Sequence, residues 1–325
     1  MGIEANETCI SDLRGDFATI SKEAMAFMRI IRFQRHDGTI GWGLESDLGL
    51  LDISGSDATL PTSSLEVMAR WEELQPRLAR LTKRLGASED ISKLLCPLDA
   101  AGKILCVGLN YRDHAAESNM PVPQEPIIFC KMPTALTGPE DPIYLPSSST
   151  KVDYEAEMVV VIGKKLRKAS PEESQAAIFG YAVGNDVSAR DWQLEKPGKQ
   201  WFLGKTFDSF APIGPGITLA SSVEDVLQLR VQTRLNGELV QDSSTKEIIF
   251  SPTHVLSYLS HVMTLMPGDV IFTGTPPGVG MAKNPPRYLQ PEDRVEIEIE
   301  KLGKISNVCL SDSTVASSDY ASCTV

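Results

Sequence analysis

Three carboxylates at the ends of two neighbouring apolar runs are the residues of this chain best placed to do chemistry. Glu155 and Glu157 stand two residues apart at the head of the run 158–163. That run is short and β-branched, which predicts a buried strand, and alternation along a strand sends both side chains to one face. Asp186 follows the next strand-like run, 180–185. Converging carboxylates with no nearby His or Cys suit Mg²⁺ better than Zn²⁺.

Spacing alone leaves a second interpretation of these acids open, in which Glu155 and Glu157 form a solvated rim on an exposed strand end. Like charges held side by side in a partly buried place repel strongly, unless a cation or a shared proton compensates them. The first interpretation therefore requires a compensating charge close by.

A histidine and a glutamate three residues apart form a second candidate site. His114 and Glu117 follow the strand-like run 103–109. If His114 begins a helical turn, Glu117 faces it. A histidine beside a carboxylate can hold a water molecule and take its proton. An ordinary surface pair at a helix start is the alternative.

Two further segments carry groups that suit an anionic substrate. In the predicted loop 193–208, Lys205 is placed to neutralise either a substrate carboxylate or the metal-site acids, and a solvated surface lysine is the alternative. The loop 274–280 offers backbone N–H groups and the Thr275 hydroxyl, which can cradle a carboxylate or enolate oxygen. This loop has no GK[ST] sequence, so a nucleotide P-loop is not expected there, and no HExxH or cysteine cluster supports a zinc hydrolase.

The composition narrows the range of partners and locations. A net charge of −12 disfavours nucleic acid and anionic membrane surfaces as partners, but leaves room for a small anionic substrate at a local cation. No apolar run approaches the ~20 residues that span a bilayer. The acidic start and the last residues match no targeting signal. The six cysteines are scattered, as is typical of reduced thiols, so we expect a cytoplasmic protein.

Several elements must position these side chains. Strand-like runs with turns predict a small antiparallel sheet over 28–53. Ser63 is the expected N-cap of one helix whose apolar residues recur from Leu65 to Leu78. A second, longer helix begins after Ser251 and is expected to stop at 267–268.

Many strands, few helices and long loops predict a mostly β, α+β fold of mixed topology. At 325 residues the chain accommodates a small and a larger domain. We divide it into an N-terminal extension (1–27), a small N-terminal domain (28–95), a catalytic domain (96–310) and a disordered tail (311–325).

Six short motifs in this order resemble those of the fumarylacetoacetate hydrolase family. The resemblance is closest to its shorter branch of acylpyruvate hydrolases, oxaloacetate decarboxylases and 2-hydroxyhepta-2,4-diene-1,7-dioate isomerases. The motifs are Gly108-Leu109-Asn110-Tyr111 with Asp113-His114 and Glu117, Lys131 with Pro133-Thr134-Ala135-Leu136, Asp153-Tyr154-Glu155 with Glu157, Asn185-Asp186-Val187-Ser188-Ala189-Arg190-Asp191, Gly204-Lys205-Thr206-Phe207-Asp208, and Thr273-Gly274-Thr275-Pro276 with Gly278-Val279-Gly280.

The resemblance implies a mixed β-sandwich roll in the C-terminal region, a small N-terminal domain and a homodimer. It implies Mg²⁺ or Mn²⁺ at Glu155, Glu157 and Asp186, and a lid dyad of His114 and Glu117. It further implies that substrate oxygens are contacted by Lys131, Arg190, Lys205 and Thr275. Arg190 serves equally well as a partner of the acids.

The chemistry implied is C–C bond cleavage of a small 2-oxo acid through a metal-stabilised enolate, as in acylpyruvate hydrolysis or oxaloacetate decarboxylation. Catalytic roles then go to His114, Glu117 and Lys205. The intact His114–Glu117 pair favours cleavage. Two alternatives stay open: an isomerase or tautomerase of a 2-hydroxymuconate- or oxaloacetate-type diacid on the same site, and a catalytically idle metal-binding homologue.

Overall fold

The computed structural model describes residues 29–46, 49–57, 59–82, 87–88, 90–117 and 120–314. The expected N-terminal extension and the chain beyond residue 314 lie outside the described residues. The strands are β1 (Arg29–Gln34), β2 (Ile40–Ser46), β3 (Gly49–Asp52), β4 (Lys93–Leu95), β5 (Ile104–Gly108), β6 (Ile127–Lys131), β7 (Leu136–Thr137), β8 (Ile143–Leu145), β9 (Val152–Asp153), β10 (Ala156–Ile162), β11 (Ile178–Asn185), β12 (Ser188–Ala189), β13 (Ala211–Leu219), β14 (Arg230–Leu235), β15 (Glu238–Ser244), β16 (Val270–Phe272), β17 (Arg294–Ile299) and β18 (Gly303–Ser311).

The helices are few and short, in agreement with the predicted mostly β class. They are α1 (Ser64–Ala69), α2 (Trp71–Thr82), α3 (Arg112–Glu117), α4 (Pro171–Ala176), α5 (Trp201–Lys205) and α6 (Pro252–Val262). Short 3₁₀ turns and one π-helical turn, η3 (Asp191–Glu195), complete the described elements.

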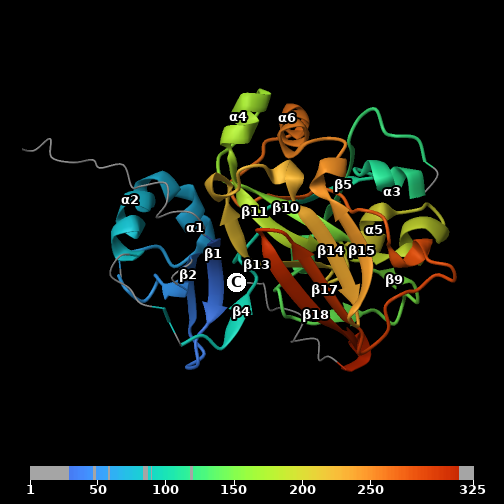
Figure 1. Ribbon diagram of the computed structural model, residues 1–325, viewed down its shortest axis with the longest axis horizontal. Helices are drawn as coiled ribbons and strands as arrows, with labels where there is room; N and C mark the ends of the chain where they lie inside the picture. Colours follow the sequence, from blue (N-terminus) through green and yellow to red (C-terminus); the bar gives the residue numbers. More distant parts are fainter. Residues whose placement is uncertain are drawn as a thin grey trace, which may run out of the picture.

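Two mixed sheets pack face to face to form the body of the molecule (Figure 1). The larger sheet has 11 strands in the described part, in the order β3-β2-β1-β13-β11-β10-β16-β5-β6, with β4 and β7 paired at its side. The smaller sheet has the order β15-β14-β17-β18-β8. Both sheets contain parallel and antiparallel pairs, as the predicted mixed topology requires.

Strand β10 lies near the middle of the larger sheet and is buried on both faces. Met158 and Val160 pack into the core that it shares with the smaller sheet. Val159 and Val161 alternate with them and enter a second core, which includes side chains of the N-terminal helix α2. A strand covered on both sides needs a continuous apolar sequence rather than an alternating one. This explains the unbroken run that follows Glu157.

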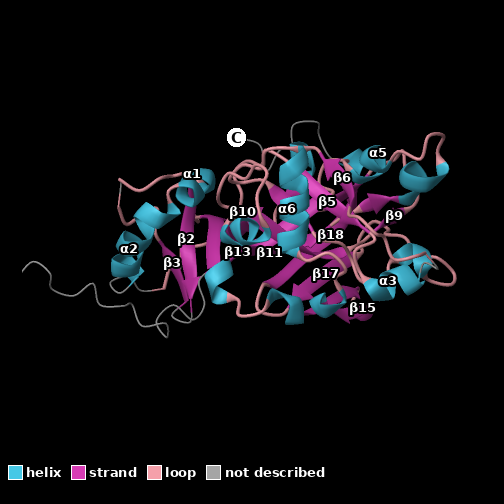
Figure 2. Cartoon of the chain, turned by 90° about the horizontal axis from the view of Figure 1, so that it is seen from above, coloured by secondary structure: helices cyan, strands magenta, loops and turns pink. Residues whose placement is uncertain are grey.

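The N-terminal strands extend the larger sheet, because β1 pairs antiparallel with β13. Figure 2 shows α1 and α2 at one end of the molecule and α3 and α5 at the other. The predicted single helix from Leu65 to Leu78 is wrong, because Arg70 leaves helical geometry (φ −107°, ψ 16°) and separates α1 from α2. The Trp71 ring packs edge-to-face on Phe179 at 5.4 Å, so tertiary packing accompanies the break. The domain boundary at residue 95 stays a prediction.

Three other expectations need correction. Helix α6, N-capped by Ser251, ends at Val262 and not at 267, because Leu265 is extended and bridges Leu166. The segment expected as a loop over 193–208 contains the end of η3 and all of α5. Residues 311–314, expected in the disordered tail, are regular, since Ser311 ends β18 beside Leu145 and a 3₁₀ turn covers 312–314.

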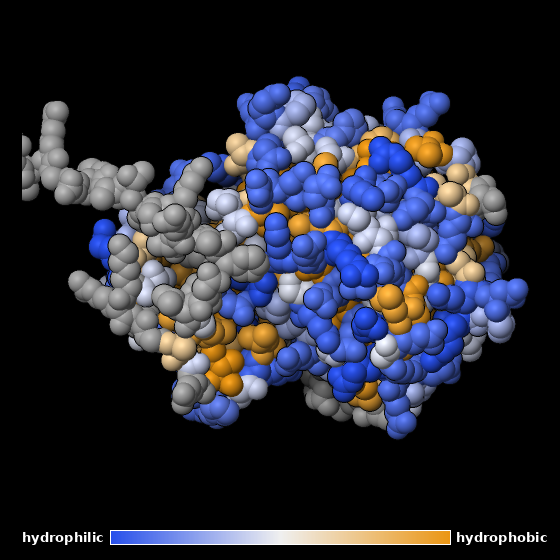
Figure 3. Space-filling model, viewed as in Figure 1, coloured by the Kyte–Doolittle hydropathy of each residue, from blue (hydrophilic) through white to orange (hydrophobic). Residues whose placement is uncertain are grey.

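In the described part of the chain, none of the helices has the length and apolar character needed to cross a membrane. Hydrophilic residues dominate the face seen in Figure 3, and hydrophobic residues appear there in small separate groups.

Candidate active site

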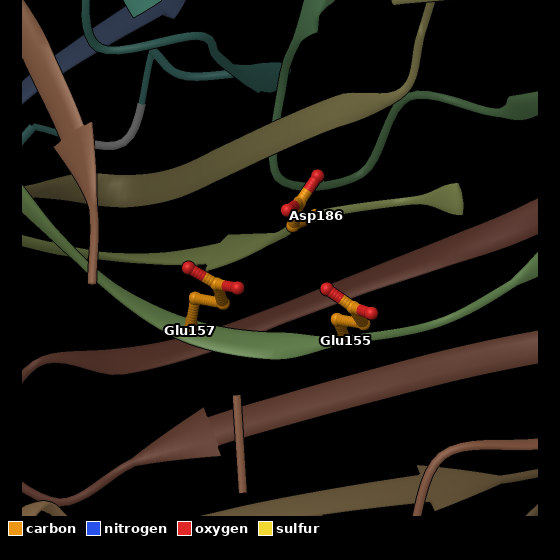
Figure 4. Close-up of side chains that lie close together, drawn as sticks. All are labelled: Glu155, Glu157 and Asp186. Carbon is orange, nitrogen blue, oxygen red and sulfur yellow. The ribbon is translucent and has the colours of Figure 1, made fainter. Parts of the chain in front are cut away.

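The three predicted acids meet at one end of the larger sheet. One carboxylate oxygen from each of Glu155, Glu157 and Asp186 lies within 4.8 Å of the other two, and all three residues are buried. Figure 4 shows Glu155 and Glu157 side by side on one ribbon with their carboxylates on the same side, and Asp186 on the neighbouring ribbon. The solvated-rim interpretation is therefore wrong, because Glu155 is 7% and Glu157 2% exposed.

Strand register brings Asp186 to the other two acids. In the β10–β11 ladder Ala156 pairs with Asn185, so Asp186 follows directly opposite Glu155. The Asp186 N–H donates to the Glu155 carbonyl at 2.9 Å, and Asn185 Oδ1 accepts from the Glu155 N–H at 3.0 Å. These bonds continue the ladder beyond the end of both strands and hold the two carboxylates together.

Three cations surround the acids, and each has a fixed position. Lys205 Nζ, from the end of α5, lies 2.7 Å from Glu155 Oε2 and 2.9 Å from Asp186 Oδ2. Arg190 Nη1 lies 2.7 Å from Glu155 Oε1. Lys131 Nζ, from the end of β6, lies 2.7 Å from Asp186 Oδ1. Glu155 and Asp186 therefore have cationic partners, whereas no ion pair to Glu157 is found among the described residues.

The two glutamates differ in proton affinity as a result. Burial by itself raises the pKa of Glu155, but the charges of Lys205 and Arg190 outweigh burial and lower the pKa to about 2. Burial raises the pKa of Glu157 well above its usual range, and the negative charges of Asp186 and Glu155 raise it further. Glu157 thus carries the part of the negative charge that the protein does not compensate.

This donor set fits a hard divalent cation. Carboxylate oxygens are the ligands that Mg²⁺ and Mn²⁺ prefer, and a dication would supply the positive charge that Glu157 lacks. Asp186 Oδ1 is buried and accepts no hydrogen bond from the described residues, because its contact to Lys131 is an ion pair without hydrogen-bond geometry. Glu157 Oε2 accepts from the Gly274 N–H at 2.7 Å, which fixes the carboxylate plane.

The His114–Glu117 pair lies on α3, as its spacing predicted. His114 Nδ1 is 3.1 Å from Glu117 Oε2, and the other Glu117 oxygen accepts from the Gly278 N–H at 2.9 Å. Because Nδ1 is engaged with Glu117, Nε2 is the ring nitrogen that remains for a substrate or a water molecule. Both side chains line the same cavity as the three acids.

The loop that follows β16 closes the site beside Glu157. Strand β16 pairs with β10, with Phe272 opposite Val159, so the next residues reach the carboxylates. Gly274 has φ +97°, and a Cβ there would lie 2.7 Å from Asn110 Cβ, so this position requires glycine. Thr275 Oγ1 lines the cavity and accepts from Gln241 Nε2 at 3.0 Å, which orients the hydroxyl.

A cavity of about 460 Å³ joins these groups. One end, which we call the carboxylate end, is formed by Glu155, Glu157, Asp186, Lys205, Thr275 and His114. Apolar side chains of the same cavity form a second group of lining residues, which we call the apolar wall: Met120, Ile127, Phe129, Leu194, Trp201 and Met281.

Lys131 is the predicted substrate contact that the geometry does not support. Besides Asp186, its ammonium donates to the carbonyls of Val187 (3.1 Å), Phe210 (2.8 Å) and Lys205. It is 2% exposed and is absent from the residues that line the cavity. Backbone from three other segments therefore buries the Lys131 ammonium, which pairs with Asp186 and holds it in place.

Two residues near the acids escaped the sequence analysis. Asp153 is fully buried, and its Oδ2 accepts from Arg190 Nε at 2.9 Å. Gln193 lines the cavity, and its Oε1 accepts from Arg190 Nη1 at 3.0 Å. The available signals were the position of Asp153 within the Asp-Tyr-Glu motif and the three-residue spacing from Arg190 to Gln193.

Comparisons with known proteins agree with this architecture. Residues 103–309, more than half of the chain, match the model of the fumarylacetoacetate (FAA) hydrolase C-terminal domain. An oxaloacetate tautomerase of Xenopus laevis, named fahd2, mitochondrial, is 42% identical over 294 residues, covering 89% of this chain and 92% of that protein.

Two solved structures extend the comparison. The 2-hydroxyhepta-2,4-diene-1,7-dioate isomerase of Mycobacterium marinum is 33% identical, with a TM-score of 0.68 over 88% of this chain and 99% of that chain. The maleylpyruvate hydrolase of Sphingobium sp. SYK-6, in complex with manganese (II) ion and pyruvate, is 28% identical, with a TM-score of 0.72 over 87% and 99%. The family model, the relative and the shared fold agree with the motifs, and this chain belongs to the fumarylacetoacetate hydrolase family of enzymes.

Proposed function

We propose that this enzyme performs enolate chemistry on a small 2-oxo acid with the help of Mg²⁺ or Mn²⁺, and that its first reaction is keto–enol tautomerisation of an oxaloacetate-type diacid. The observation that carries the proposal is the buried carboxylate cluster with an uncompensated Glu157, at one end of a cavity that the His114–Glu117 pair also lines. The 42% identity to an oxaloacetate tautomerase favours tautomerisation over the C–C cleavage preferred from the sequence.

Glu155, Glu157 and Asp186 would hold the ion, which when bound supplies Lewis-acid stabilisation of a developing enolate. The other steps belong to side chains. Lys205 and the Thr275 hydroxyl lie at the carboxylate end, where charge and hydrogen bonding favour the enolate oxygen. His114, oriented by Glu117, removes a proton from C3 of the substrate through Nε2 and delivers it to the enolate oxygen on C2, which gives the enol.

C–C cleavage is the second candidate, because the same pair can activate a water molecule. It is supported by the fold shared with a maleylpyruvate hydrolase that binds manganese and pyruvate. The two reactions need the same substrate end, but they differ in their products. Cleavage releases pyruvate, whereas tautomerisation changes only the keto–enol ratio.

NMR separates these reactions. Full-length protein with MnCl₂ or MgCl₂ is mixed with oxaloacetate or acetylpyruvate, and enol, keto and pyruvate signals are followed against a protein-free control with the same metal. Faster keto–enol exchange without extra pyruvate supports the tautomerase. Pyruvate formed above the control, and lost in Glu157→Gln and His114→Ala proteins, supports cleavage. Failure of both reactions, with metal still bound, would favour the idle homologue.

The predicted homodimer and the cytoplasmic location remain proposals. Sedimentation of the purified protein measures the first. Imaging of the tagged full-length chain measures the second, and a mitochondrial signal would bring it into line with the name of the Xenopus relative.

A further inference from the structure

The cavity is larger and more apolar than an oxaloacetate-type substrate requires. A four-carbon diacid is almost entirely polar, and it would be satisfied by the carboxylate end alone. The apolar wall then has no role in holding it, although side chains from four separate segments of the chain form this wall. These are the segment after α3, β6, the η3–α5 segment and the loop after β16.

The apolar wall continues directly from the catalytic residues. Lys205 Nζ lies 5.1 Å from the centroid of the Phe129 ring. Phe129 meets Trp201 edge-to-face, with ring centroids 5.6 Å apart. A Cβ on Gly108 would lie 2.8 Å from the Trp201 ring, so this glycine leaves room for the indole. A substrate with its 2-oxo acid at Lys205 would extend along Phe129 towards Trp201.

Several side chains of this wall are accessible to solvent. Met120 is 52%, Ile127 38% and Met281 37% exposed, although all three line the cavity. An apolar ligand that covers them removes their surface from water, which is favourable at about 25 cal/mol per Å². A charged group in the same place would lose hydration without gaining a partner.

The cations that line the cavity lie beside the acids. Among the described residues that line it, the lysines and arginines are Lys205 and Arg190, and both are paired with Glu155. Arg190 Nη2 is buried without a hydrogen-bond partner in the described part. Since Nη1 of the same guanidinium lies 2.7 Å from Glu155, Nη2 can serve a carboxylate close to the reacting carbons, such as that of oxaloacetate, but not one at the end of a longer arm.

Lys196, which lies between Leu194 and Trp201 in the chain, is also engaged elsewhere. Its Nζ lies 3.2 Å from the centroid of the Trp192 ring. The wall therefore provides contact area without charge.

We propose that this cavity has an arm subsite for 2-oxo acids that carry an uncharged apolar chain, and that it discriminates against chains of the same length that end in a carboxylate. The inference rests on the proposed function, because the 2-oxo acid end must first be held at the carboxylate end. It goes beyond that function by naming the substrate class that fills the rest of the cavity.

Calorimetry with the full chain and MnCl₂ tests the subsite using three ligands that cannot be cleaved between C3 and C4 as acylpyruvates are. Pyruvate has no arm, 2-oxooctanoate has an apolar arm, and 2-oxooctanedioate has an arm of equal length with a terminal carboxylate. We expect 2-oxooctanoate to bind at least about tenfold more tightly than 2-oxooctanedioate. A tenfold ratio of dissociation constants corresponds to a difference of about 1.4 kcal/mol in binding free energy. Equal affinities, or a tighter dioate, overturn the proposal.

An Ile127→Lys variant places a cation on the wall at an exposed position of an edge strand. We expect this variant to bind 2-oxooctanoate more weakly and 2-oxooctanedioate more tightly than the wild type, and to bind pyruvate with the same affinity. Ile40→Lys is the matched control, since Ile40 is an exposed isoleucine of β2 (56%) that does not line the cavity. If Ile127→Lys binds 2-oxooctanoate and 2-oxooctanedioate with unchanged affinities, the arm subsite is overturned and the proposed function is not. If the wild-type protein binds none of the three ligands, pyruvate included, the proposed function is overturned as well.

Discussion

Asp153 and Arg190 form a buried ion pair beside the carboxylate cluster, with Arg190 Nε 2.9 Å from Asp153 Oδ2. The same carboxylate accepts the N–H groups of Tyr154 (2.9 Å), Gly280 (2.7 Å) and Met281 (3.0 Å). Asp153 thus holds both the guanidinium that contacts Glu155 and the loop that carries Met281 to the cavity.

Asp153→Asn should impair the enzyme without preventing folding. An amide offers one accepting oxygen and a donating NH₂ where two accepting oxygens now bind four N–H groups. We expect a fall in kcat/KM of about 10–100-fold, the range found for residues that orient metal ligands. Steady-state kinetics checks this, together with the Mn²⁺ dissociation constant.

Asp141→Asn is the matched control for this substitution. Asp141 is also buried and accepts the Gly138 N–H at 2.8 Å, but it lies outside the cavity. Equal kinetic losses in both variants would mean that Asp153 acts only through general stability.

Glu157→Gln should weaken Mn²⁺ binding by at least about tenfold, because it removes the ligand whose charge the protein leaves uncompensated. Calorimetric titration of the metal-free protein measures this. Glu296→Gln, on β17, is a suitable control, since Glu296 does not line the cavity. Unchanged affinity in Glu157→Gln would place the ion elsewhere.

The stability of the metal-free protein should fall as pH rises. The folded state raises the pKa of Glu157 above the ordinary 4.5, so it binds a proton that the unfolded chain releases. That contribution is present below pH 4.5 and is lost as pH increases towards the raised value. Glu155, with its pKa lowered to about 2, contributes in the opposite sense and loses its contribution only as pH falls below 4.5.

Urea unfolding in a chelating buffer between pH 5 and pH 9 checks this prediction. The free energy of unfolding should decline less with rising pH in Glu157→Gln than in the wild type. Added Mn²⁺ should reduce the decline in the wild type. An identical pH profile for wild type and variant would contradict the uncompensated charge on Glu157.

Lys131→Met should destabilise the fold rather than alter substrate affinity. It leaves Asp186 without one of its two lysines and three backbone carbonyls without their donor. Breaking a buried pair by removing one partner costs about 3–5 kcal/mol. Denaturant unfolding measures the loss, and the KM of the folded fraction should stay near the wild-type value. A large rise in KM at unchanged stability would restore Lys131 as a substrate contact.

His114→Ala should lower kcat by about 10²–10⁴-fold, the usual contribution of a general acid–base group, with little change in Mn²⁺ affinity. Glu117→Gln keeps the shape of the pair but removes the charge that orients Nδ1, and it should have a smaller effect. His254→Ala is the control, since His254 lies on α6 and does not line the cavity. Normal turnover in His114→Ala would exclude the dyad from the reaction.

Part of the site could be predicted from the sequence by itself, because it depends only on the residue periodicity within a single strand or helix. The two-residue spacing puts Glu155 and Glu157 on the same side of one strand. The three-residue spacing brings Glu117 to His114 on one helical turn. Such relations are set by backbone geometry over a few residues. The apolar run after Glu157 likewise predicted a buried strand.

Relations between distant segments were decided only by the tertiary structure. Asp186 meets Glu155 through the register of β10 and β11, which no local pattern specifies. The sequence does not distinguish Lys131 from Lys205. In the folded chain Lys131 is buried against backbone carbonyls, whereas Lys205 lines the cavity. The apolar wall is also assembled from separate segments. Contacts of this kind depend on how sheets and loops pack in three dimensions, and spacing along the chain carries little of that information.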